Sequence, residues 1–191
     1  YVRYVEMVAL PLISSCDACI PPTIHENAIT HNTYCALYLK EDKLNEAQER
    51  CWLAIEYAPK YAEPYNNLGL IEFARKNLGR AKDHFKTAIS YKNDFAEAHN
   101  NLAWLLAVCP HAEYRDGHRA VEYATHACKR FLGESPYCLG TLAAAYAEAG
   151  EFARAIKWQT KAIEIATPDY DVPAAESRLK LYKAGKVYRE E

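Results

Sequence analysis

The chain has 191 residues, half of them hydrophobic, which is enough for one compact domain or a short stack of repeats. Its net charge is −2 and it has no long basic run, so general nucleic-acid binding is disfavoured. No run of about 18 apolar residues occurs, so no transmembrane span is predicted.

Residues 1–27 are expected to form an N-terminal extension. Residues 1–16 are apolar, and Pro11 should interrupt any helix there. One interpretation is an extra helix that covers the open end of the helices that follow. The alternative is the remnant of an export signal, because Ile13-Ser14-Ser15-Cys16 resembles the lipobox of bacterial lipoproteins, whose cysteine carries a lipid anchor. Glu6 interrupts the apolar run and argues against the export signal.

Cys16 and Cys19 form a C-x-x-C pair, the spacing used by metal and redox sites. A second such pair is absent, and Ile20 stands where a haem-attachment motif has histidine. The seven cysteines are an odd number, so at least one has no intrachain partner. We expect two ordinary cysteines here and no cofactor; a metal or redox module is the third alternative for function.

Small residues recur at a fixed spacing from residue 35 onward. Ala47 and Ala81 are 34 residues apart, a period typical of stacked helix pairs. Apolar residues three or four apart place one face of each helix in the core. The small residues are Cys35, Ala47, Ala54; Gly69, Ala81, Ala88; Ala103, Ala120, Ala127; and Ala143, Ala155, Ala162. For Cys35 and Cys51 the simplest expectation is that each acts as a small buried apolar residue.

This pattern resembles the tetratricopeptide repeat (TPR) family in its bacterial form, over about residues 28–167. Repeat two carries it as Tyr65, Leu68, Gly69, Glu72, Ala81, Phe85, Ala88 and Asn93. The resemblance implies an all-α fold, a right-handed superhelical solenoid of about four helix hairpins with an N-terminal extension and a C-terminal capping helix. The expected segments are 1–27, repeats at 28–61, 62–95, 96–135 and 136–169, and a cap at 170–191.

Repeats one and two are expected to have helices near 28–40, 44–57, 62–75 and 78–91. Repeat three departs from the pattern, because Ala103 and Ala120 are 17 residues apart against 12 in the other copies. The extra residues fall in the loop 109–117, where Asp116 suits a helix cap. This loop is either a neutral surface insertion or a source of His111, Tyr114 or Arg115 for a partner. Cys109 and Cys128 flank this hairpin and are close enough in sequence to approach each other.

Repeat four begins at Ser135-Pro136, a cap followed by a proline that suits the first helical turn. Residues 172–184 are expected to form the last helix. Its apolar residues Ala175, Leu179 and Tyr182 should face the repeats, whereas Arg178 and its neighbouring lysines should face water.

The family resemblance implies a concave face lined by the first helix of each pair. The candidate peptide-binding residues on it are Asn32, Asn66, Asn67, Leu70, Phe73, Glu97, Asn100, Asn101, Trp104 and Tyr137. Asn67 and Asn101 occupy equivalent places, and an amide both donates and accepts, so the pair suits a peptide backbone. The cations that hold a free carboxylate in chaperone-binding relatives are missing. Alternatively, the asparagines cap contacts between helices and Trp104 is core.

No catalytic constellation is present: there is no Gly-rich phosphate loop, no GxSxG and no HExxH. We therefore expect a non-catalytic adaptor that binds a protein or peptide partner. The alternative is a TPR lipoprotein of the bacterial envelope that assists the assembly of a pilus or secretion secretin. The expected location is cytoplasmic or envelope-associated in a bacterium, and the terminal apolar helices either cap the stack or pair two chains.

Overall fold

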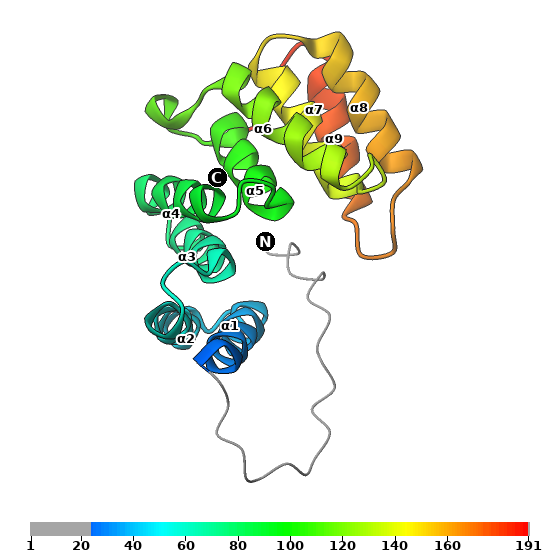
Figure 1. Ribbon diagram of the computed structural model, residues 1–191. Coiled ribbons are helices and arrows are strands. Elements are labelled where there is room, and N and C mark those ends of the chain that lie inside the picture. The colour runs from blue at the N-terminus through cyan, green and yellow to red at the C-terminus, as the bar shows by residue number, and fades with distance from the viewer. Residues whose placement is uncertain (1–23, 191) are drawn as a thin grey trace. The chain divides into compact units, whose positions relative to one another are not determined.

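The computed structural model describes residues 24–190, whose regular structure consists of helices (Figure 1). The chain divides into two compact units, residues 1–92 and residues 93–191. Each unit is made of antiparallel helix hairpins, so the predicted all-α fold of repeated helix pairs is confirmed. Residues 1–23, with Cys16, Cys19 and the lipobox-like run, lie outside the described residues.

The first unit contains two hairpins. The helices are α1 (Ile24–Lys40), α2 (Leu44–Tyr57), α3 (Ala62–Ala74) and α4 (Leu78–Tyr91). α1 packs on α2, α3 on α4, and α3 also packs on both helices of the first hairpin. The helix positions agree with the sequence, except that α1 begins at Ile24 rather than near residue 28.

The small residues of the repeat pattern lie where the two helices of a hairpin approach most closely. Ala47, Ala54 and Ala81 are fully buried. One close approach is at Gly69, where an added β-carbon would lie 2.4 Å from the ring of Phe85. A side chain of any size at position 69 would therefore displace Phe85, which explains why the spacing of small residues marks the repeats.

The second unit contains α5 (Ala96–Val108), a short 3₁₀ turn η1 (Ala112–Tyr114), α6 (Gly117–Arg130), α7 (Pro136–Glu148), α8 (Phe152–Glu164) and α9 (Val172–Lys183). α5 packs on α6 and α7, α7 packs on α8, and α8 packs on α9. α5 and α7 are buried on almost every side, whereas α6 and α8 bury one stripe each.

Polar caps begin three helices of this unit. Asp116 accepts a hydrogen bond from the backbone N–H of Arg119 at 3.0 Å, as the sequence predicts. Ser135 accepts one from Cys138 N–H, and Asp171 caps α9 in the same way. The residues that follow α9 have no regular secondary structure, and residues 187–190 are half-buried.

Two disulfide bonds join helices within the units, and the first of them corrects an expectation. Cys35 of α1 and Cys51 of α2 are fully buried, as expected, but their sulfurs are bonded to each other across a Cα–Cα distance of 5.3 Å. Cys128 of α6 is bonded to Cys138 of α7 and not to Cys109, which is free and buried. The sequence spacing did not predict these pairs, because packing between helices brings the cysteines together.

Candidate functional site

The predicted polar residues of the first unit bind one another. The Asn67 side-chain N–H donates to the Asn32 side-chain oxygen at 2.9 Å, and Asn32 in turn donates to the Tyr61 hydroxyl at 3.5 Å. Burial, helped by the charge of Glu63, raises the pKa of Tyr61 from its usual 10 to about 12. These side chains form a polar row that joins α1, α3 and the turn before α3.

The other predicted residues of this unit are partly or wholly used in packing. Leu70 packs against the core cluster that contains Leu39 and Leu68. Asn66 is buried, and Phe73 is half-buried. Asn67 belongs to the first unit and Asn101 to the second, so the ladder expected between them stays a prediction.

In the second unit the predicted residues differ in exposure. Asn100 and Asn101 are buried, whereas Glu97 is exposed. Tyr137 is tied to the loop before α9, because its hydroxyl donates to the backbone carbonyl of Asp169 at 2.9 Å and its ring packs edge-on against Tyr170. Trp104 is half-buried, and of these residues it has the most informative surroundings.

Trp104 is covered by the segment that follows α9. Its ring lies 6.1 Å from the ring of Tyr188, between centroids, and its indole N–H donates to the carboxylate of Glu190. The guanidinium of Arg178 lies 5.6 Å from the Trp104 centroid and 5.7 Å from that of Tyr188. The expectation that Arg178 faces water is therefore wrong: it lies against two aromatic rings, a favourable position for a cation.

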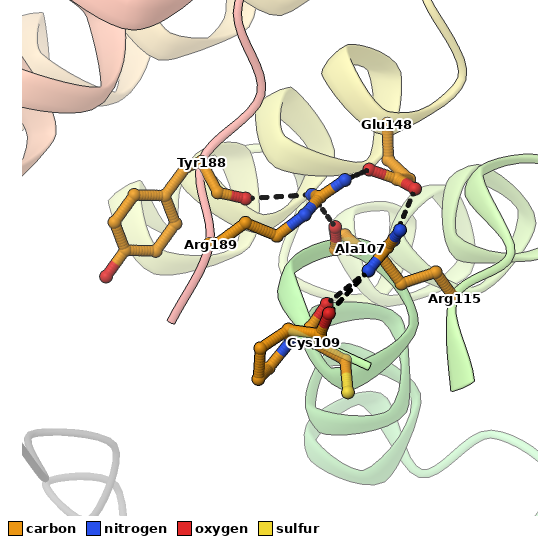
Figure 2. A network of polar contacts seen from close by, with 7 residues as sticks. Ala107, Cys109, Arg115, Glu148, Tyr188 and Arg189 are labelled. Carbon is orange, nitrogen blue, oxygen red and sulfur yellow. Dashed lines mark hydrogen bonds and ion pairs between the residues drawn. The ribbon is translucent and has the colours of Figure 1, made fainter. Parts of the chain in front are cut away.

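Glu148, at the end of α7, binds two arginines at once (Figure 2). One carboxylate oxygen lies 3.0 Å from Nε of Arg115, and the other lies 2.7 Å from a terminal nitrogen of Arg189. Arg115 comes from the lengthened loop, where it also donates to the backbone carbonyls of Cys109 and Pro110 at 3.1 and 2.8 Å. The loop is thus more than a neutral insertion within its own unit, because it orients Glu148.

The last carbonyls of α5 complete this arrangement. A helix leaves its final four carbonyl groups without partners inside the helix. The carbonyl of Val108 accepts from the backbone N–H of Glu190 at 3.0 Å, and that of Ala107 accepts from Arg189 at 3.3 Å. The negative end of the helix dipole also favours the two guanidinium groups near it.

We call residues Trp104, Ala107, Val108 and Glu148 the α5–α7 surface, and residues 187–190 the tail segment. The sequence missed this pairing. Tyr188, Arg189 and Glu190 follow the last helix, carry no periodic pattern, and contact residues more than 80 positions earlier. A signal was present only on one side, since Trp104 was named as a candidate peptide-binding residue on the first-helix face.

Within residues 24–190 no three His, Cys, Asp or Glu side chains are placed to share a metal ion. No helix in that range is both long enough and apolar enough to cross a membrane.

Comparison with known proteins identifies the repeat type. The family model described as Tetratricopeptide repeat matches residues 137–167, the hairpin of α7 and α8. A search of curated proteins gave no match.

Solved structures with the same fold come from several sources. PilF of Pseudomonas aeruginosa is 18% identical, with a TM-score of 0.69 over 84% of this chain and 70% of its own. A thermophilic TPR protein of Thermus thermophilus is 19% identical, with a TM-score of 0.61 over 84% of this chain and 81% of its own. Yeast Tom70 is 19% identical, with a TM-score of 0.65 over 83% of this chain but only 33% of its own. At these identities the similarity shows a shared fold and nothing about partners.

Proposed function

We propose that the chain, which has the fold of tetratricopeptide repeat proteins and matches the family model over residues 137–167, is a non-catalytic interaction scaffold. It holds an extended peptide of a partner protein on the faces of the first helices of its hairpins. The observation that supports this proposal is that the α5–α7 surface already holds an extended segment, residues 187–190, through ring, ion-pair and backbone contacts. The chemistry needed to bind an extended peptide is therefore assembled on a first-helix face.

The residues assigned to binding follow from this proposal. Trp104 supplies an aromatic anchor, a residue type that often dominates the binding energy of interfaces. In the first unit the half-buried Asn67 would offer a peptide backbone the amide N–H that it donates to Asn32 in the free chain. The exposed Glu97 favours a neutral or basic segment.

A selection from a displayed random-peptide library tests the proposal. Peptides enriched on the wild-type chain should bind the Trp104→Ala variant about thirtyfold more weakly, the loss for an anchor worth about 2 kcal/mol. Trp52→Ala is the matched control, because Trp52 is exposed on a second helix of the other unit. Circular dichroism must show that both variants are folded. Equal binding by Trp104→Ala, or no enriched peptides, would refute the proposal for this face.

A second candidate is an envelope lipoprotein that assists the assembly of a pilus or secretion secretin. The observation that favours it is Ile13-Ser14-Ser15-Cys16 ahead of the repeats. Mass spectrometry of the native protein tests it: a diacylglyceryl group on Cys16 supports the lipoprotein, and an unmodified Cys16 rules it out. The same interaction faces would serve either role.

A further inference from the structure

The tail segment is held on the second unit without being part of a helix. α9 ends at Lys183, and Gly185 then takes a φ of +66°, a left-handed conformation that turns the chain away from the helix axis. Figure 2 shows the backbone after this turn passing the end of α7, with Arg189 directed at Glu148. Residues 187–190 are half-buried, as the side chains of a bound peptide would be.

Three kinds of contact recognise three consecutive residues. Tyr188 packs beside Trp104 and under the guanidinium of Arg178. Arg189 makes the 2.7 Å ion pair with Glu148. The backbone N–H of Glu190 donates to the carbonyl of Val108, and the carboxylate of Glu190 accepts from the indole N–H of Trp104. The α5–α7 surface therefore has contacts for an aromatic residue, an arginine and an acidic residue in that order.

The carboxylate that binds Arg189 is held from the opposite side by the lengthened loop. Arg115 binds the other oxygen of Glu148 and is fixed in turn by two backbone carbonyls. These contacts involve no residue of the tail segment. Glu148 thus has an orientation set in advance, which reduces the entropy lost when an arginine binds.

We infer that the α5–α7 surface binds a partner peptide containing an aromatic residue followed by arginine and an acidic residue. The tail segment is the internal ligand that this peptide displaces. The inference rests on the proposed function and specifies the ligand of the same face. It assigns Glu148 to the arginine, Trp104 and Arg178 to the aromatic residue, and the end of α5 to the peptide backbone.

A partner peptide of ordinary affinity can compete with the tail segment for the α5–α7 surface. The contacts of Arg189 and Glu190 are few, but the side chains of Arg189 and Glu148 are only 29% and 14% exposed, so their ion pair is worth more than a fully exposed one. A short tether gives a local concentration on the order of millimolar. A partner peptide that binds in the micromolar range therefore replaces the tail segment, whereas a weaker one does not.

The test uses a dye-labelled peptide with the sequence of residues 184–190, Ala-Gly-Lys-Val-Tyr-Arg-Glu, added to the full chain. Its affinity for the Arg189→Ala chain should be at least about tenfold higher than for the wild type, because the internal competitor is weakened. Arg189→Ala leaves Tyr188 on its apolar cluster, so the fold is kept. Lys186→Ala, at an exposed position of the same segment, is the matched control and should leave the affinity unchanged.

Two further variants check the assignment of the arginine. The same peptide with alanine in place of arginine should bind the Arg189→Ala chain at least about tenfold more weakly. In the chain, Glu148→Gln combined with Arg189→Ala should lower the affinity of the unchanged peptide by a similar factor, since the amide keeps the size and removes the charge. If neither change lowers the affinity of the peptide, the inference is wrong.

The outcomes separate this inference from the proposed function. Library peptides that need Trp104 but lack the aromatic–arginine order would overturn the inference and leave the proposed function intact. The absence of any Trp104-dependent peptide would overturn both. A different result is that the Lys186→Ala control forms a dimer whose fraction rises with concentration, and that adding Arg189→Ala abolishes this dimer. The α5–α7 surface would then bind the tail segment of a second copy, and the proposal of a partner peptide would be wrong.

Discussion

Gly69 of α3 lies against the ring of Phe85 of α4 so closely that a β-carbon would be 2.4 Å from Cε1. Phe85 is 1% exposed, so its ring cannot move out into solvent to make room. Gly69→Ala should therefore lower the free energy of unfolding by about 1–3 kcal/mol, the usual cost of overpacking, although alanine favours helix. Urea unfolding followed by circular dichroism measures this.

The steric reason can be separated from a general effect of the mutation. In a Phe85→Leu background the ring is absent, so Gly69→Ala should cost less than in the wild type. An equal cost in both backgrounds would show that Phe85 is not the source of the strain.

Glu72 of α3 is a nearly buried carboxylate with two partners inside the first unit. Arg75 contacts one oxygen at 3.2 Å, and the Asn77 side-chain N–H donates to the other at 2.9 Å. Arg75 also donates to Gln48 of α2 at 2.9 Å. Arg75→Ala leaves the buried charge without its cation and should lower the free energy of unfolding by about 2–3 kcal/mol.

An exposed arginine provides the control for this prediction. Arg154 pairs with Glu151 at 2.8 Å on the surface, so Arg154→Ala should change stability by less than about 1 kcal/mol. Adding Glu72→Met to Arg75→Ala should recover part of the loss, because no buried charge remains. If the double variant is less stable than Arg75→Ala alone, the explanation by charge burial is wrong.

The helices were predictable because helix–helix packing leaves a size signal in the sequence. Residues such as Ala47 and Ala81 must be small where two helices touch, and this requirement recurs with the period of the repeat. The start of α1 was missed by four residues (28 − 24), since the boundary of a helix leaves a weaker signal in the sequence than its interior.

The candidate site was less predictable, because its contacts depend on side chains far apart in sequence. Trp104 was identified as an anchor, but its partners Tyr188 and Glu190 lie in a segment with no pattern of its own. Arg115 was named only as one of three loop residues, and its contact with Glu148 depends on how the loop folds back on α7. Such contacts do not recur at a fixed spacing in the sequence, so the repeat pattern does not predict them.

The bond between Cys35 and Cys51 should stabilise the first unit in oxidised protein. The two cysteines are 16 residues apart, and closing a loop of this size contributes about 3 kcal/mol in the chain-entropy account. Peptide mapping without reduction should recover the Cys35–Cys51 pair and the Cys128–Cys138 pair. Reductant should lower the melting temperature of the wild type more than that of a Cys35→Ala, Cys51→Ala variant; an equal effect would contradict the prediction.

His99 of α5 should make the second unit sensitive to acid. Its ring is stacked on that of His126 with 4.0 Å between centroids, Tyr123 lies 5.5 Å away, and Nε2 is 2.9 Å from the Asn93 carbonyl. A carbonyl oxygen can only accept, so Nε2 carries the proton and neutral His99 has a bare Nδ1. That Nδ1 is buried and has no hydrogen-bond partner among the described residues.

Burial, together with the charge that His126 can carry, lowers the pKa of His99 below its usual 6.5 despite the favourable Asn93 carbonyl. A lowered pKa in the folded state means that the unfolded chain takes up the proton first. The resulting stability is fully present above about pH 6.5 and is lost as the pH falls from there toward the folded pKa.

His99→Phe keeps an aromatic ring on His126 and removes the titrating group. Between about pH 7.5 and pH 5.5 the free energy of unfolding should therefore fall less for this variant than for the wild type. Urea titrations at several pH values measure the difference. The pKa values of His31 and His84 in the first unit are lowered by burial too, so both proteins will lose some stability. Identical slopes for the two proteins would mean that His99 is not responsible, because its protonation would then cost the fold nothing.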